Sequence, residues 1–293
     1  MNPAIQLLKR IARPAIRRFR RLIRRRVDEP SCTCRFGDLI VHYPADSLIG
    51  QFIAAGTGWD LNLGTVVSQL VQQSTPTFVD VGSNIGASLM QMKLAKPASF
   101  VYCFEPSDRF LPYLDQNIAA NGWANVTVER TVLSSHAGSM RLHTNASTAS
   151  VVSREYDGHD FRFDELVRAT TLDSYFGGLG SVHFIKIDTD GYDFDVLLGG
   201  SSLLRRDRPV IYFEFAPDLL KRANRHPRDF LSFLIGHGYE DFFAFSNRGE
   251  PLGVKTSVMD LGSLIQEDCP YLDLVTTHHS ARAAVSVLSL RPP

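Results

Sequence analysis

The sequence has 293 residues, 44% of them hydrophobic, and its 31 basic and 31 acidic residues give a formal net charge of zero. This apolar content is sufficient for the core of one large domain, or of one domain with an appendage, and it excludes a chain too polar to fold. The four cysteines show no framework spacing, which argues against a disulfide scaffold and favours a reducing compartment.

The zero net charge hides an asymmetry at the N-terminus. Residues 1–27 contain one lysine, nine arginines and no acid, so the rest of the chain has 21 bases against 31 acids. Apolar residues recur at helical spacing in this arm, which predicts a basic amphipathic helix. It lacks both the run of apolar residues that a membrane span needs and the apolar core of a secretory signal. A solvated tail and attachment to an anionic membrane surface remain as interpretations, with a transit peptide or a nucleic-acid arm less favoured.

Residues 28–75 form a lead-in between the arm and the main domain. The stretch Cys34–Tyr43 is predicted to be a strand, and Trp59–Gln73 a helix that Asp60 or Asn62 caps. The sequence STPT then ends this helical pattern.

From residue 76 to residue 293, strand and helix patterns alternate. This alternation is typical of an α/β domain with a mainly parallel sheet and helices on both faces. The predicted strands are Phe78–Val81, Phe100–Phe104, Val126–Arg130, His183–Ile187, Val210–Phe215, Asp241–Phe245 and Leu272–Thr277. The predicted helices are Ile85–Ala95, Arg109–Asn121, Phe194–Leu204 and Arg228–Gly236.

A glycine loop, DVGSNIG, follows the first of these strands. Asp80, Gly82, Asn84 and Gly86 form the pattern D-x-G-x-N-x-G, which is neither the dinucleotide fingerprint G-x-G-x-x-G nor a phosphate loop ending in lysine. Glycines at a strand end let a ligand approach the backbone, and the next helix offers free N–H groups. Some such loops are only tight turns.

The second strand ends in an acidic residue, Glu105, 25 residues after Asp80. A carboxylate at this place accepts hydrogen bonds from both hydroxyls of a ribose, so the pattern indicates an adenosine ligand. The alternative is that Glu105, followed by Pro106 and Ser107, only caps the next helix.

Five motifs in this order make the chain resemble the FkbM family of S-adenosylmethionine-dependent methyltransferases. They are FVDVGSNIG, FEPS, NIAANG, FIKIDTDGYDFDVLLGG and PVIYFEF, and the resemblance runs from about Gly37 to Gly249. It implies a Rossmann-like class I methyltransferase fold with a seven-stranded sheet and an antiparallel last hairpin. It also implies O-methyl transfer, often to a sugar hydroxyl.

The resemblance assigns roles to residues of the glycine loop and of the second strand. Asp80, Gly82, Asn84 and Gly86 are expected to line the methionine part of S-adenosylmethionine, and Glu105 to hold its ribose. We expect adenine contacts from the end of the third strand, where Thr131, Val132 and Leu133 lie. The chain has T-D-G-Y-D where the family has V-E-G-x-E, so Asp190 and Asp193 replace glutamates.

Methyl transfer to a hydroxyl needs positioning, which supplies about 7–11 kcal/mol in favourable geometry, and removal of the hydroxyl proton. Asp188, at the carboxyl end of its strand, is the candidate general base, and Lys186 is expected to orient it or the acceptor. Alternatively, Asp188, Asp190 and Glu214 hold Mg²⁺, which would lower the acceptor's pKa. A third interpretation is that these carboxylates only cap the next helix.

The sequence therefore predicts an S-adenosylmethionine-dependent O-methyltransferase. The expected acceptor is a saccharide, a glycolipid or a related natural product, and nucleic acid is not expected as a partner. The alternatives are a catalytically silent binding module of the same fold and, less favoured, a nicotinamide dehydrogenase. We expect a cytoplasmic protein, peripheral on the inner face of the membrane if the arm attaches to lipid.

Overall fold

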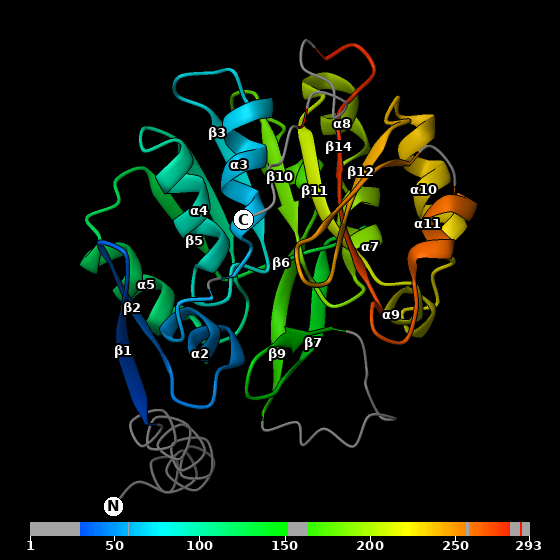
Figure 1. Cartoon of the computed structure of the whole chain (residues 1–293). Helices are drawn as coiled ribbons and strands as arrows, with labels where there is room; N and C mark the ends of the chain where they lie inside the picture. Colours follow the sequence, from blue (N-terminus) through cyan, green and yellow to red (C-terminus); the bar gives the residue numbers. More distant parts are fainter. Residues whose placement is uncertain (1–29, 58, 152–162, 256–257, 282–287, 289–293) are drawn as a thin grey trace, which may run out of the picture.

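The computed structural model describes residues 30–57, 59–151, 163–255, 258–281 and 288, so the basic arm lies outside the described residues (Figure 1). Its main element is an eight-stranded sheet in which only β14 and β13 run antiparallel to the rest. In spatial order the strands are β13 (Pro251–Lys255), β12 (Phe242–Ser246), β14 (Leu272–Thr276), β11 (Val210–Phe215), β10 (Phe184–Ile187), β3 (Thr77–Val81), β4 (Phe100–Phe104) and β5 (Val126–Glu129).

The mainly parallel α/β architecture is confirmed, and all seven predicted strands of the domain are present. The sheet has eight strands instead of the expected seven because the chain turns back at Gly249, whose φ is +78°, and pairs β13 with the edge of β12.

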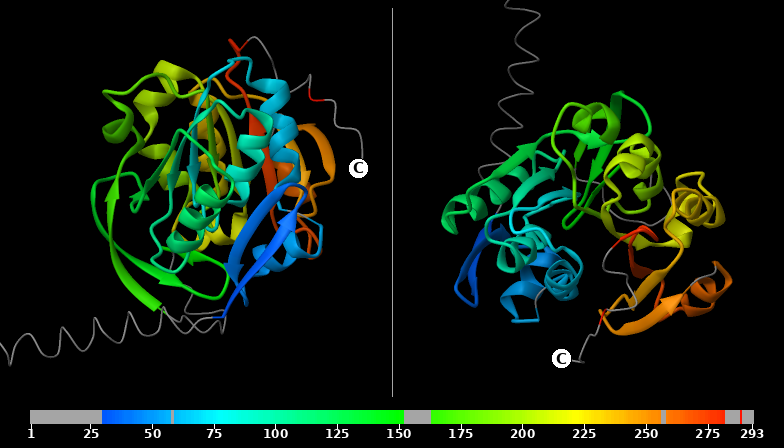
Figure 2. Two further views of the ribbon diagram at one scale, coloured as in Figure 1. Left: turned by 90° about the vertical axis from the view of Figure 1, so that its left-hand side faces the viewer. Right: turned by 90° about the horizontal axis from the view of Figure 1, so that it is seen from above.

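Helices cover both faces of this sheet (Figure 2). Successive side chains of a strand point to opposite faces, and in β3 Phe78 packs among one set of helices while Val79 and Val81 pack among the other. The first face carries α3 (Leu61–Leu70), α4 (Ala87–Ala95) and α5 (Leu111–Ala120). The second carries α6 (Leu172–Phe176), α7 (Asp193–Leu198), α8 (Ser201–Asp207), α9 (Pro217–Arg222), α10 (Pro227–Gly236) and α11 (Val258–Leu264).

The lead-in differs from its prediction. The single expected strand is a hairpin of β1 (Ser31–Phe36) and β2 (Leu39–Pro44), because Gly37 adopts φ +58° and reverses the chain. A short helix, α2 (Leu48–Ala54), follows it. Asp60 precedes α3 as expected, but its side chain makes no capping hydrogen bond.

A second, four-stranded sheet was not predicted. In Figure 1, this second sheet lies below the main sheet. It comprises β6 (Val132–Leu133), β9 (Phe163–Thr170), β7 (Gly138–Thr144) and β8 (Ala149–Ser150).

The predicted helix Phe194–Leu204 is in fact two helices, α7 and α8. The chain bends at Gly199, where a Cβ atom would lie 2.0 Å from the carbonyl oxygen of Ser134. Only glycine permits this contact, and the next residue, Gly200, leaves the helical conformation with φ −117° and ψ 14°, which separates α7 from α8. Within the described residues, no helix has both the length and the apolar character needed to cross a membrane.

Candidate active site

The register of the main sheet brings the predicted polar residues to one edge. Lys186 of β10 is aligned with Asp80 of β3 on one side and with Tyr212 of β11 on the other. Side chains two residues apart share a face, so Asp188 and Glu214 follow on the same side at the carboxyl ends of their strands. Carboxylates that are far apart in the sequence thus meet near the N-terminus of α3, where Asp60 lies.

Lys186 is the centre of this group. Its Nζ lies 3.2 Å from Asp188 Oδ2, 3.9 Å from Asp60 Oδ2 and 4.0 Å from Asp80 Oδ1. The Lys186 side chain is 4% exposed, and burial alone disfavours its charge, but the three carboxylates outweigh burial and raise the pKa of Lys186. Lys186 is therefore a buried cation in contact with Asp188, and its predicted role of orienting Asp188 or the acceptor remains a prediction.

Asp60 also belongs to this group, although the sequence analysis predicted for it only the capping of a helix. It adopts φ +52°, and its carboxylate faces Lys186 instead of the amides of α3. Asn62 Nδ2 holds the segment by donating to the carbonyl of Gly249, at 2.6 Å. Burial raises the pKa of Asp60 to about 6, although Lys186 opposes the shift. No local pattern in the sequence indicates this contact, because Asp60 and Lys186 lie in separate elements.

The glycine loop packs tightly on the strand that carries Asp188. Gly82 has φ +79°, and a Cβ atom there would lie 2.0 Å from the carbonyl oxygen of Asp188. Asp80 is fully buried, and both of its carboxylate oxygens accept from the hydroxyl of Ser88, at 2.8 and 2.9 Å. Asp80 thus connects the end of β3 to α4 through Ser88. Gly86, with φ +91°, is the N-cap residue that precedes this helix. The predicted contact of these residues with methionine remains a prediction.

Glu105 connects the glycine loop after β3 with the loop after β4. It is 3% exposed, and its Oε2 accepts from the backbone N–H of Asn84 while its Oε1 accepts from that of Ser107, both at 2.8 Å. Burial raises the pKa of Glu105 to about 7, against the effect of these two N–H groups. Each oxygen keeps a second lone pair, so a ribose diol can still bind there.

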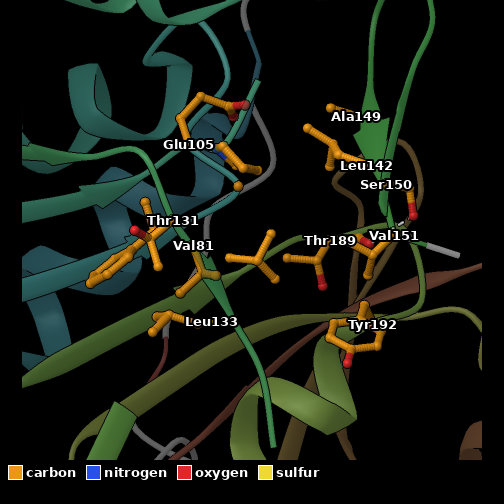
Figure 3. A pocket seen from close by; sticks show the side chains of 14 residues that line it. Val81, Glu105, Thr131, Leu133, Leu142, Ala149, Ser150, Val151, Thr189 and Tyr192 are labelled. Atoms are coloured by element: carbon orange, nitrogen blue, oxygen red, sulfur yellow. Dashed lines mark hydrogen bonds between the residues drawn. The ribbon is translucent and has the colours of Figure 1, made fainter. Parts of the chain in front are cut away.

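A pocket opens beside Glu105 (Figure 3). Its wall is mostly apolar, as expected for a pocket that accepts an adenine ring. Thr131, Val132 and Leu133, the predicted adenine residues, all line it. Sequence reasoning missed the opposite wall, which the second sheet and the loop after β10 supply: Leu142, Ala149, Ser150, Val151, Thr189 and Tyr192.

The predicted magnesium set of Asp188, Asp190 and Glu214 is not supported. Among the residues that the structure describes, no group of three His, Cys, Asp or Glu side chains is placed to hold a metal ion. Glu214 is buried among carboxylates, and burial together with Asp188, Asp190 and Asp193 raises its pKa well above the ordinary value.

Asp193, the first residue of α7, binds the turn that leads into the helix and makes no capping hydrogen bond to the helix itself. Its Oδ2 accepts from Thr189 Oγ1 at 3.1 Å and from the N–H of Gly191 at 3.2 Å. Asp188 has no such role, because its Oδ2 accepts from Lys186. Its side chain is 35% exposed, so among these acids it is open to an acceptor.

Comparison with known proteins gives matches in sequence and in structure. The model of the methyltransferase FkbM domain matches residues 80–240. The 2-O-methyltransferase NoeI of Sinorhizobium fredii is 23% identical over 184 residues, which cover 57% of this chain and 74% of NoeI.

Two solved structures are similar at low identity. The methyltransferase FkbM from Methylobacillus flagellatus aligns with a TM-score of 0.43 and 17% identity, over 71% of this chain and 47% of that chain. This chain thus spans about half the length of that protein. TYW2 of M. jannaschii, solved in complex with AdoMet, aligns with a TM-score of 0.46 and 11% identity, over 85% of this chain and 86% of that chain.

Proposed function

Because the chain belongs to the FkbM family of S-adenosylmethionine-dependent methyltransferases, we propose that it methylates a hydroxyl oxygen of a saccharide or glycolipid acceptor. The observation that carries this proposal is the half-exposed Asp188, held by Lys186 at the strand edge where the glycine loop and the pocket meet. A carboxylate there has the chemistry to take a hydroxyl proton. The name of NoeI, a 2-O-methyltransferase, supports oxygen as the acceptor atom.

The residues present fit S-adenosylmethionine. The apolar pocket beside Thr131 and Leu133 suits adenine, Glu105 presents two carboxylate oxygens to a ribose, and the surrounding acids favour a cation. When bound, this cofactor supplies a methyl group on positively charged sulfur. The protein's own part is to hold the acceptor oxygen in line and to accept its proton on Asp188, with Lys186 keeping that carboxylate in place.

The first experiment is a calorimetric titration of the full-length protein with S-adenosylmethionine, with NAD as the control ligand. We expect S-adenosylmethionine to bind and NAD not to bind. The affinity for S-adenosylmethionine should be the same with and without Mg²⁺. Binding followed by no turnover on any saccharide or glycolipid of a broad panel would support the silent module instead. Failure of a folded protein to bind S-adenosylmethionine would contradict the proposed function.

Glu105→Ala is expected to weaken S-adenosylmethionine binding by roughly 1–3 kcal/mol, because charge-assisted hydrogen bonds to the ribose are lost. The backbone N–H groups of Asn84 and Ser107 also lose their acceptor, so some loss of stability accompanies it. Glu250→Ala, at an exposed glutamate in the β12–β13 turn, is the matched control. Calorimetry measures the affinity, and an unchanged value for Glu105→Ala would remove Glu105 from the ribose site.

The affinity should also depend on pH through Glu105. Burial raises the pKa of this carboxyl to about 7, so its charged, accepting form is lost as the pH falls below that value. We expect weaker binding at pH 6 than at pH 8 in the wild type. Glu105→Gln, which cannot titrate, should bind with a flatter pH dependence, and equal slopes for the two proteins would contradict the assignment.

A further inference from the structure

Helix α2 carries an apolar patch on its outer face. Leu48 and Phe52 lie one helical turn apart on one side of α2, and they are 55% and 47% exposed. The ring of Trp59, from the segment that follows, lies 5.9 Å from the ring of Phe52. We call these three residues the α2 patch. The helix sequence LIGQFIA contains no charged residue, so this surface is apolar and uncharged.

The basic arm joins the described chain beside this helix. The N–H of Ala45 donates to the carbonyl of Pro30 at 2.9 Å, which places the first described residue next to the segment that leads into α2. Residues 1–27, just before it, contribute ten basic residues and no acid. A strongly basic segment thus precedes an uncharged apolar patch in the sequence, and the first described residue lies next to the segment that leads into that patch.

The α2 patch is at the same end of the molecule as the candidate site. The N–H of Leu48 donates to Ser147 Oγ at 3.0 Å, and the carbonyl of Ser147 accepts from Asn84 Nδ2 at 2.9 Å. Asn84 in turn donates its backbone N–H to Glu105. Three hydrogen bonds therefore connect α2 with the carboxylate of the pocket. In Figure 1, α2 lies near the second sheet, whose residues form one wall of that pocket.

We propose that the α2 patch binds the surface of an anionic lipid bilayer, with the ten bases that precede residue 28 in the sequence adding electrostatic attraction. Leucine, phenylalanine and tryptophan side chains enter the boundary between headgroups and acyl chains, and each nearby base adds up to about 1 kcal/mol of attraction to anionic lipid. The strength of such binding increases with the apolar area buried and with the electrostatic attraction to anionic lipid, so the two contributions add. A patch of three side chains is small for a dimer interface, which buries about 800 Å² on each partner.

Because three hydrogen bonds link α2 to Glu105, this attachment would hold the pocket near the membrane surface. The acceptor class that fits is then a saccharide carried on a lipid anchor, with its hydroxyls in the headgroup region. This assignment of the acceptor rests on the proposed function. Binding to the bilayer does not, because it needs neither the cofactor nor turnover.

The test is sedimentation of the full-length protein with vesicles of phosphatidylglycerol and phosphatidylcholine, compared with phosphatidylcholine alone. The double variant Leu48→Ser, Phe52→Ser removes the patch. The matched control is Leu94→Ser, Phe100→Ser, which removes a leucine and a phenylalanine that are 56% and 46% exposed at the opposite end of the sheet. Calorimetry with S-adenosylmethionine, without vesicles, reports on the site separately.

We expect wild type and control to bind the anionic vesicles alike, and the patch variant to need about tenfold more lipid or more for half-saturation. Trp59 emission should shift to shorter wavelength on binding in a Trp123→Phe background. Equal binding by the patch variant, or no binding by the wild type, would overturn the proposal. A lipid-free dimer that the patch variant dissociates would also overturn it, because a second copy would then cover the patch.

Discussion

Asp188→Asn is expected to lower kcat by about 10²–10⁴-fold while leaving S-adenosylmethionine affinity nearly unchanged. Asparagine keeps the shape of the side chain and can still accept the hydrogen bond from Lys186, but it cannot take a proton from the acceptor. The rate is measured as S-adenosylhomocysteine formed with a saccharide acceptor taken from the panel, and the affinity is measured by calorimetry. A variant that turns over at the wild-type rate would end the claim that Asp188 is the base.

Two further variants distinguish a general base from a metal site. Asp190→Asn and Glu214→Gln alter the other members of the predicted magnesium set. If Asp188 acts as the base, both should lower kcat far less than Asp188→Asn, and a chelator should have no effect on the wild type. Losses of similar size in all three variants, reversed by added Mg²⁺, would instead favour a shared ion.

The sequence motifs identified those residues of the candidate site that directly follow a strand. The glycine loop, Glu105 and Asp188 each follow a strand whose apolar run is visible in the sequence, and parallel strands bring such ends to one edge. The same reasoning failed for Asp60, because its position opposite Lys186 depends on how the lead-in packs over the sheet. Packing between segments that are far apart in the chain produces no periodic pattern in the sequence.

The second sheet was missed for a related reason. Two of its strands, β6 and β8, have only two residues each, too short for an alternating pattern to be recognised, whereas β7 and β9 are long enough and were still not predicted. The break between α7 and α8 had a local signal, the pair Gly199-Gly200, which the prediction of one helix overlooked. The second sheet supplies part of the pocket wall, so the residues that follow predicted strands were easier to predict than the opposite wall.

Gly82→Ala is expected to destabilise the protein by about 4 kcal/mol or more, the range of exceptional single substitutions. The added Cβ atom would lie 2.0 Å from the carbonyl oxygen of Asp188, a backbone atom that no rotamer change can move. The loop cannot shift easily either, because the N–H groups of Gly82 and Ser83 both donate to the carbonyl of Phe104. Either the loop or the strand end that carries Asp188 must move, so activity should fall together with stability.

Gly122→Ala is the control that separates this collision from backbone strain. Gly122 has a similar positive φ, +62°, but a Cβ atom there meets no heavy atom within 4 Å. Its substitution should cost only the strain of the left-handed conformation, about 1–2 kcal/mol. Urea unfolding of both variants measures the difference. Equal losses would mean that the contact between Gly82 and Asp188 imposes no constraint of its own, whereas a much larger loss for Gly82→Ala would show that the cofactor loop and the proposed base are held as one rigid unit.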